Sequence, residues 1–367
     1  MTSRNKIRVA ILGAGGAGRN IMGKDIVEHG HLYVLAGFYD PSAEALAKAT
    51  AQYPAATMYS SYEAMLADST IELVLIATMP HQSHPAQAIQ SLHAGKHCVV
   101  IKPFCYTVAE ADAMIRAAQK AHRLVTCFQN VRWSLDFLQA METLQNRDFG
   151  RLLYVYSNPG GEHGPGDTLY VFGSHYIDQL FLLGGGYPVE VAATFWNPAE
   201  TDPAKRGGYI IQMRLANGVL ATLDCLPPSL NPSARRDLGV RFKITGTKEH
   251  YVGWRVDQLV DVMREHGYVG NDHGPVKFYT YQRPRFLEYR WKIPTYWESL
   301  YASLREEAPL LVPPEHTRQV AKVYEAAARS SQSGRTVSLQ DDGPQPFPAF
   351  RVIEGGVEAP WLNQFPF

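Results

Sequence analysis

The chain has 367 residues, of which 46% are hydrophobic, and its 35 basic and 35 acidic residues cancel to a formal net charge of zero. This length suits two domains, and the absence of a long charged run argues against nucleic acid or a membrane surface as a partner. We find no apolar leader segment and no stretch long enough to span a bilayer, so we expect a cytoplasmic protein that acts on a small molecule. The cysteines form no C-x-x-C pair, which argues against a disulfide framework or a cysteine zinc site: Cys98, Cys105, Cys127 and Cys225.

Residues 7–21 predict a strand, a tight turn and the start of a helix. The apolar run IRVAIL is followed by glycines at G-x-G-x-x-G spacing, which is typical of dinucleotide binding when it follows a strand. Gly13 would permit the turn, Gly15 would let a pyrophosphate approach the backbone, and Gly18 would let the helix pack on the strand. Glycines also end strands for local reasons, and that alternative stays open. The residues expected to face the phosphates are Gly13, Gly15, Gly16, Ala17 and Gly18.

A second apolar strand is predicted over residues 31–40, and it ends in Asp40. Asp40 lies at the distance from the glycines that is typical of the acidic residue on the adenosine ribose. The alternative is that Asp40 caps the next helix, because Pro41 follows it at a position that suits a first helical turn. No Arg or Lys occurs between Asp40 and Lys48, so a 2′-phosphate has no obvious partner and NAD is favoured over NADP.

Strand and helix patterns alternate up to residue 128. After a helix over 41–53 and a short segment at 57–59, we expect a small helix with capping-box spacing at Ser60 and Glu63. Strands are predicted at 71–78, 97–101 and 124–128, with a helix ending at Gly95 and another opened by a capping box at Thr107 and Glu110. This alternation predicts a parallel doubly wound sheet whose ligand crevice lies at the carboxyl ends of the strands. Further cofactor contacts expected there are Thr78, His81, His84, Lys102, Pro103 and Asn130.

Lys102 is the most informative residue at these strand ends. A lysine beside the expected nicotinamide can donate a hydrogen bond to a substrate oxygen, and Pro103 would fix the turn, with a cis bond as one option. The alternative is a surface lysine before a strand-ending proline. His81 and His84 form an H-x-x-H pattern, but neither a cysteine nor a carboxylate lies near, so we expect a helix cap or a ligand contact and no metal.

From residue 151 the pattern changes to successive strands, which predict a largely antiparallel sheet: 151–158, 188–196, 208–215, 218–226 and 240–247. The insertion 159–186 ends in a helix that we expect Ser174 to cap and Gly184 to stop. His175 and Asp178 share a face of its first turn, either at a site or merely at a solvated helix end. Two amphipathic helices, 296–307 and 315–332, precede an extended tail over 341–367 whose Trp361, Phe365 and Phe367 are apolar enough to dock.

Taken together, several segments resemble the Gfo/Idh/MocA oxidoreductases in order and spacing over residues 5–340: GAGGAGRNI, ATMPHQSHPAQAIQSLHAGKHCVVIKPF, QNVRWSLDF, FGRLLYVYS, GSHYIDQLFLLGG, ITGTKEH and AARSSQSGRTVSL. The resemblance implies an α/β protein with an N-terminal Rossmann domain over 1–130. It implies a C-terminal α+β domain over 131–340 with a large, open, mostly antiparallel sheet, and members often form dimers or tetramers through that sheet. Residues 341–367 remain as a tail.

The resemblance also assigns roles. Lys102 matches the lysine of the family's Glu-Lys-Pro motif and His175 the histidine of its Asp-x-x-x-His motif, while Ile101 and Val171 replace the two acids. If His175 is the acid/base group, its carboxylate partner must be another residue, with Asp178, Asp167 and Glu162 as candidates and Asp178 as our choice.

These features lead to the hypothesis of an NAD-dependent dehydrogenase of a sugar or cyclic polyol. His175 would take the hydroxyl proton while Lys102 stabilises the charge that develops on the oxygen. Two alternatives stay open: a glycoside hydrolase or lyase that uses transient oxidation and retains NAD, and a non-catalytic NAD- or sugar-sensing regulator. Substrate contacts are expected at Arg132, Asn130, His163 and Tyr170.

Overall fold

A computed structural model describes residues 5–159, 168–196, 208–225, 240–254 and 295–339, together with Gly343, Phe347, 351–353 and 356–358. Contacts group the chain into two compact units. Unit 1 comprises Met1–Gln129, Thr295–Glu325 and Asp342–Pro348, and unit 2 comprises Asn130–Pro294, Ala326–Asp341 and Ala349–Phe367. The first boundary lies next to the expected one at 130. The segment 295–325, which the sequence assigns to the second domain, groups with unit 1 in the structure.

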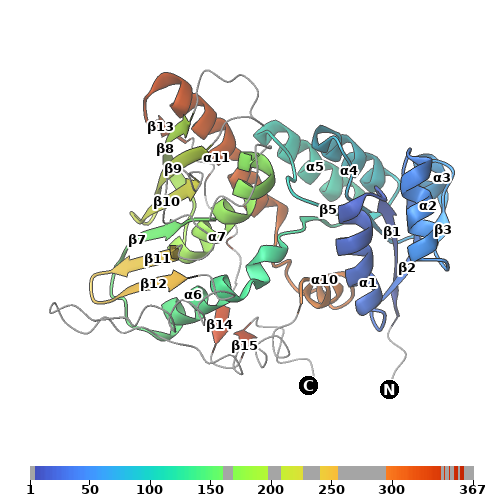
Figure 1. Cartoon of the computed structure of the whole chain (residues 1–367), viewed down its shortest axis with the longest axis horizontal. Helices are drawn as coiled ribbons and strands as arrows, with labels where there is room; N and C mark the ends of the chain where they lie inside the picture. The colour runs from blue at the N-terminus through green and yellow to red at the C-terminus, as the bar shows by residue number, and fades with distance from the viewer. Residues whose placement is uncertain are drawn as a thin grey trace, which may run out of the picture. The chain divides into compact units, whose positions relative to one another are not determined.

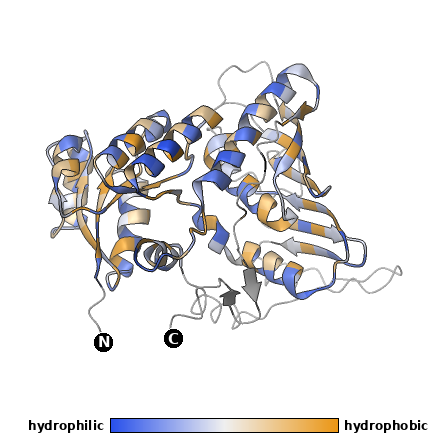
Figure 2. Ribbon diagram, turned by 180° about the vertical axis from the view of Figure 1, so that it is seen from behind, coloured by the Kyte–Doolittle hydropathy of each residue, from blue (hydrophilic) through white to orange (hydrophobic). Residues whose placement is uncertain are grey.

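Unit 1 contains a six-stranded parallel sheet in the order β3-β2-β1-β4-β5-β6, which is the strand order of a Rossmann fold and confirms the expected doubly wound sheet. Most of these strand residues are buried, as parallel strands with helices on both faces require, and Figure 2 shows them mainly in hydrophobic colours. The strands are β1 (Ile7–Leu12), β2 (Tyr33–Tyr39), β3 (Thr57–Met58), β4 (Leu73–Ile76), β5 (His97–Val100) and β6 (Val125–Cys127).

Side-chain caps open several helices of unit 1, and one of these caps lies where the sequence predicts it. Thr107 and Glu110 form the expected capping box. The small helix is capped by Ser61, which accepts from the Ala64 N–H, so the prediction of a box at Ser60 and Glu63 was wrong by one residue. The elements are η1 (Gly18–Gly23), α1 (Lys24–Glu28), α2 (Ala43–Gln52), α3 (Tyr62–Ala67), η2 (His81–Ser83), α4 (His84–His93) and α5 (Val108–Ala121).

Helix α10 (Tyr296–Arg305) belongs to unit 1 because its aromatic face packs on that unit. Trp297 is buried, and its Nε1–H donates to Asp25 Oδ2 at 2.9 Å. The Tyr33 hydroxyl donates to the Trp297 carbonyl at 2.6 Å, and the two rings meet edge to face. Phe128 packs against the same indole ring. These aromatic contacts explain why a segment far along the chain completes the first core.

Unit 2 is built on a seven-stranded sheet in the order β12-β11-β7-β10-β9-β8-β13. All of its neighbouring strands are antiparallel except β7 and β10, which are parallel, so the expected mostly antiparallel sheet is confirmed. The strands are β7 (Leu152–Ser157), β8 (Pro188–Trp196), β9 (Gly208–Leu215), β10 (Leu220–Cys225), β11 (Val240–Gly246), β12 (His250–Trp254) and β13 (Val337–Ser338).

Helix α7 (Ser174–Gly184) lies along this sheet and packs on β7 and β10 (Figure 1). Every residue of α7 is buried. The π-helical turn η4 (Thr168–Gly173) runs directly into α7, so Ser174 does not cap it, and Gly185, with φ +68°, ends it in place of Gly184. The helical segment is therefore longer at both ends than the sequence pattern predicts. The remaining elements of this unit are η3 (Asn130–Trp133), α6 (Leu135–Asn146), β14 (Arg351–Ile353) and β15 (Gly356–Glu358).

Helix α11 (Pro314–Ser333) is divided between the two units after Glu325. Within the expected tail, β14 and β15 form an antiparallel pair, whereas Trp361, Phe365 and Phe367 lie outside the described residues. In the described ranges, none of the helices has both the length and the apolar composition needed to cross a bilayer.

Candidate cofactor and active site

The glycine turn after β1 has the geometry that its spacing predicts. Gly13 has a φ of +101°, and a Cβ at this position would lie 2.6 Å from the carbonyl oxygen of Ala77. A Cβ at Gly18 would overlap the carbonyl oxygen of Gly13. Gly15 and Gly16 are exposed, and a Cβ on either would meet no protein atom within 4 Å. The first and last glycines are therefore needed by the fold, while the two between them leave room for a ligand to reach the backbone.

Asp40 connects the end of β2 to this turn. Its Oδ2 accepts from the Ala14 N–H at 2.7 Å, and its Oδ1 accepts from the Ser42 N–H at 2.8 Å. The cap of α2 is Ser42, whose hydroxyl accepts from the Ala45 N–H, so Asp40 is not the helix cap that the sequence left as an alternative. These contacts place a half-buried carboxylate beside the glycines.

The ends of β4 and β5 are joined by His84. This side chain is completely buried, with Nδ1 2.8 Å from the Pro103 carbonyl oxygen and Nε2 3.0 Å from that of Thr78. The Lys102–Pro103 peptide is cis, which was one option that the sequence left open. Because main-chain carbonyls occupy both ring nitrogens, the geometry gives His84 a structural role in place of the expected cofactor contact.

His81 lies next to this bridge, its ring centroid 5.2 Å from that of His84. Burial, followed by the charges of His84 and Lys102, lowers the pKa of His81 to about 4, so its imidazole is neutral at neutral pH. Lys102 is half-buried after β5, whereas the side chain of Ile101 is 7% exposed and belongs to the core. In the described part of the chain, no group of three or more His, Cys, Asp or Glu side chains could hold a metal ion.

In unit 2, His175 occupies the first turn of α7 and is 3% exposed. Asp178, one turn later, is paired with Arg132: the guanidinium Nε–H donates to Oδ2 at 2.7 Å and Nη2–H to Oδ1 at 2.5 Å. Both side chains are fully buried. Arg132 and Asp178, which the sequence assigns to a substrate contact and to the partner of His175, thus form a buried ion pair with each other within unit 2.

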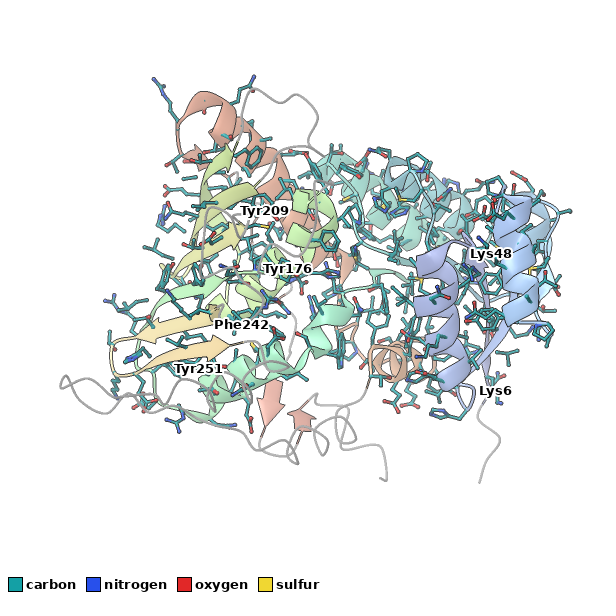
Figure 3. All side chains as sticks on the ribbon, viewed as in Figure 1. Lys6, Lys48, Tyr176, Tyr209, Phe242 and Tyr251 are labelled. Atoms are coloured by element: carbon teal, nitrogen blue, oxygen red, sulfur yellow. The ribbon has the colours of Figure 1, made fainter. Side chains whose placement is uncertain are left out.

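Arg241 of β11 is a buried group that the sequence analysis missed, since nothing in the strand pattern distinguishes it from a surface arginine. Its guanidinium reaches Asp136 Oδ2 at 2.9 Å, Ser157 Oγ at 3.1 Å and Gln179 Oε1 at 3.2 Å. It also lies over the rings of Tyr176 and Phe242, two of the residues labelled in Figure 3. Burial opposes ionisation of Asp136, but the Arg241 charge brings the pKa of this carboxyl below its usual value.

The other expected site residues are spread over unit 2. Asn130 is exposed at the start of η3, and Tyr170 is half-buried in η4 together with Val171. Glu162, His163 and Asp167 lie outside the described residues.

Comparison with known proteins gives a consistent result. The Gfo/Idh/MocA model described as an oxidoreductase family with an NAD-binding Rossmann fold matches residues 7–129, and the model of its C-terminal alpha/beta domain matches 147–339. An uncharacterized oxidoreductase of Schizosaccharomyces pombe is 28% identical, with 85% of this chain and 92% of that protein covered. The scyllo-inositol 2-dehydrogenase (NADP(+)) IolW of Bacillus subtilis is 27% identical, with coverages of 91% and 96%.

Among solved structures, the WlbA dehydrogenase from Bordetella pertussis in complex with NADH and UDP-GlcNAcA matches with a TM-score of 0.71. The two chains are 23% identical, and the match covers 92% of this chain and 100% of WlbA. At this level of identity, the likeness shows that the fold is shared.

Proposed function

The chain belongs to the Gfo/Idh/MocA family of NAD-binding oxidoreductases, and on this premise we propose that it is an NAD-dependent dehydrogenase of a sugar or cyclic polyol. The observation that carries the proposal is the Asp40 carboxylate held at the glycine turn, beside the exposed backbone of Gly15 and Gly16. The relatives support the substrate class, since IolW is a scyllo-inositol 2-dehydrogenase and WlbA is bound to the nucleotide sugar UDP-GlcNAcA.

The residues of unit 1 fit NAD better than NADP. The Asp40 carboxylate can accept hydrogen bonds from ribose hydroxyls, whereas a 2′-phosphate there would meet a like charge. The N–H groups of Gly15, Gly16 and Ala17 would hold the pyrophosphate. Further contacts proposed at the strand ends are Thr78, His81, Lys102, Pro103 and Asn130.

Bound NAD supplies a hydride acceptor for the carbinol C–H. In the proposed reaction Lys102 donates a hydrogen bond to the substrate oxygen, and His175 takes the hydroxyl proton, so that an alcohol is converted to a carbonyl. Tyr170 and His163 are proposed substrate contacts. Because Ile101 provides no carboxylate beside Lys102, this lysine would lose its proton more readily than one that follows a glutamate.

We also propose a cytoplasmic homodimer or homotetramer that associates through the open face of the second sheet. Exposed apolar side chains on three of its strands, Leu153, Leu220 and Val252, support this assembly. Sedimentation of the purified protein tests it, and a single monomeric species would rule it out.

The function is tested with a panel of inositols, free sugars and nucleotide sugars, following nicotinamide absorbance with NAD and with NADP. We expect NADH formation with at least one substrate and a preference for NAD. Product formed without net NADH would point to the hydrolase or lyase alternative. NAD binding without turnover of any compound would favour the sensor.

A further inference from the structure

Helix α7, which carries His175, has no exposed residue. Interior contacts therefore fix where the imidazole lies. His175 and Asp178 are three residues apart on this helix, so their side chains share one face and lie about 5–6 Å apart at Cβ. At this separation inside a protein, the charge at position 178 acts strongly on the protonation of the imidazole.

Two consecutive residues of α7 hold two consecutive residues of η3. The Asp178 carboxylate accepts hydrogen bonds from the Nε–H and Nη2–H groups of Arg132. Gln179 Nε2–H donates to the Val131 carbonyl at 2.8 Å. The fork geometry restricts both the distance and the rotation of α7 against η3. Because both charged groups are fully buried, removing either one takes an opposite charge away from the other in the interior.

The other charged groups on the elements packed around α7 are also mostly engaged. Arg241 of β11 pairs with Asp136 of α6, and Asp224 of β10 accepts from the Tyr156 hydroxyl of β7 at 2.8 Å. Glu142 of α6 is buried as well. Within the described ranges, Arg241–Asp136 and Arg132–Asp178 are two pairs of opposite charge near the helix, and α7 contributes Asp178 to the second.

We propose that Arg132 and Asp178 are positioning residues for His175. They hold the first turn of α7 in place, and their matched charges keep the electrostatic field at the imidazole small. This inference rests on the proposed role of His175 as the proton acceptor. In this proposal Asp178 acts on His175 through its ion pair with Arg132, and it does not take the proton from His175 directly.

The two members of the pair predict opposite effects on His175. Asp178→Asn leaves the Arg132 cation unbalanced, which disfavours a charged imidazole, so the protonation midpoint of His175 falls. Arg132→Met leaves the Asp178 carboxylate unbalanced, so the midpoint rises. We expect shifts of about one pH unit in each direction. The double variant Arg132→Met/Asp178→Leu removes both charges and is expected to restore the wild-type midpoint.

The experiment is a pH titration followed by NMR of the full chain labelled with ¹⁵N-histidine, with His175→Gln identifying the signal. Opposite shifts in the single variants, together with recovery in the double variant, support the proposal. Shifts in the same direction, or unchanged midpoints, overturn it. If a single variant does not fold, the double variant and Arg132→Lys decide. Both are expected to keep the wild-type midpoint, since the first removes both charges and the second retains both, and a shifted midpoint in either one overturns the proposal.

The readout does not depend on enzymatic activity. A wild-type protein without dehydrogenase activity would refute the proposed function, whereas the His175 titration would still report on the charge pair. If activity is found, the acidic limb of the kcat/KM profile should move with the NMR midpoint in each variant.

Discussion

The Asp40 carboxylate and the Ala14 N–H, 26 residues apart in the chain, form a 2.7 Å hydrogen bond between the end of β2 and the glycine turn. The same carboxylate accepts from the Ser42 N–H at the start of the next helix. One side chain thus fixes the spacing of two adjacent strand ends. It leaves a negative charge where the adenosine ribose of NAD is proposed to bind.

Replacing Asp40 with Asn should weaken NAD binding and change the preference between cofactors. The amide keeps one acceptor oxygen but loses the charge, so we expect about a tenfold loss in NAD affinity, equivalent to about 1.4 kcal/mol, and a smaller loss or a gain for NADP. Fluorescence titration with both nucleotides measures the ratio. Ser42→Ala is the control, because it removes a helix cap without changing the charge; an equal effect on both nucleotides in Asp40→Asn would contradict the assignment.

Two glycine variants separate folding from cofactor binding. In Gly15→Ala the new methyl group meets no protein atom, so the chain should fold normally and bind NAD at least about tenfold more weakly. In Gly18→Ala the methyl group overlaps the Gly13 carbonyl, so the melting temperature should fall sharply. Thermal unfolding and NAD titration of both proteins test this contrast, and normal NAD binding by Gly15→Ala would contradict the proposed phosphate site.

His84→Ala should destabilise unit 1. It removes the ring N–H that donates to a main-chain carbonyl of Thr78 or Pro103, and a buried group left unsatisfied costs about 1–3 kcal/mol. Urea unfolding measures the loss, with His81→Ala as the matched control because that imidazole is only half-buried. Equal stabilities of the two variants would show that the contacts of His84 with Thr78 and Pro103 do not stabilise unit 1.

Stability should decrease as the pH falls from about 6.5 toward 4. His97 Nδ1 accepts from the Leu124 N–H, and burial, followed by the Arg123 charge, lowers the pKa of His97 to about 4. The unfolded chain binds a proton near pH 6.5, so in this window it carries more protons than the native state and is favoured by acid. Denaturant midpoints measured across the range should fall less steeply in His97→Asn; an unchanged slope would exclude this origin.

Lys102→Met should abolish turnover while leaving NAD affinity nearly intact, since the lysine is proposed to contact the reacting oxygen. Loss of a general acid or base costs about 10²–10⁴ in rate. Lys102→Arg, which keeps the charge but changes the geometry and the proton affinity, is the control. Retained activity in Lys102→Met would remove this residue from the mechanism.

Local patterns in the sequence were sufficient to predict the first sheet and its glycine turn. Strand, turn and helix follow one another at short range there, and Gly13, Gly18 and the Thr107–Glu110 box adopt the expected conformations. The same local reasoning failed at α7, where a π-helical turn extends the helix beyond Ser174.

The sequence by itself determined the fold class, the conformation of the glycine turn and the location of Lys102 and His175 along the chain, because periodicity and motif spacing act between near neighbours. The tertiary structure alone decided how the long-range polar groups pair. It directed Arg132 to Asp178, placed the Arg241 guanidinium over the rings of Tyr176 and Phe242, and set both ring nitrogens of His84 within hydrogen-bond distance of main-chain carbonyls. These pairings follow from burial, since a charge or polar atom removed from water must find its partner wherever the folded chain provides one.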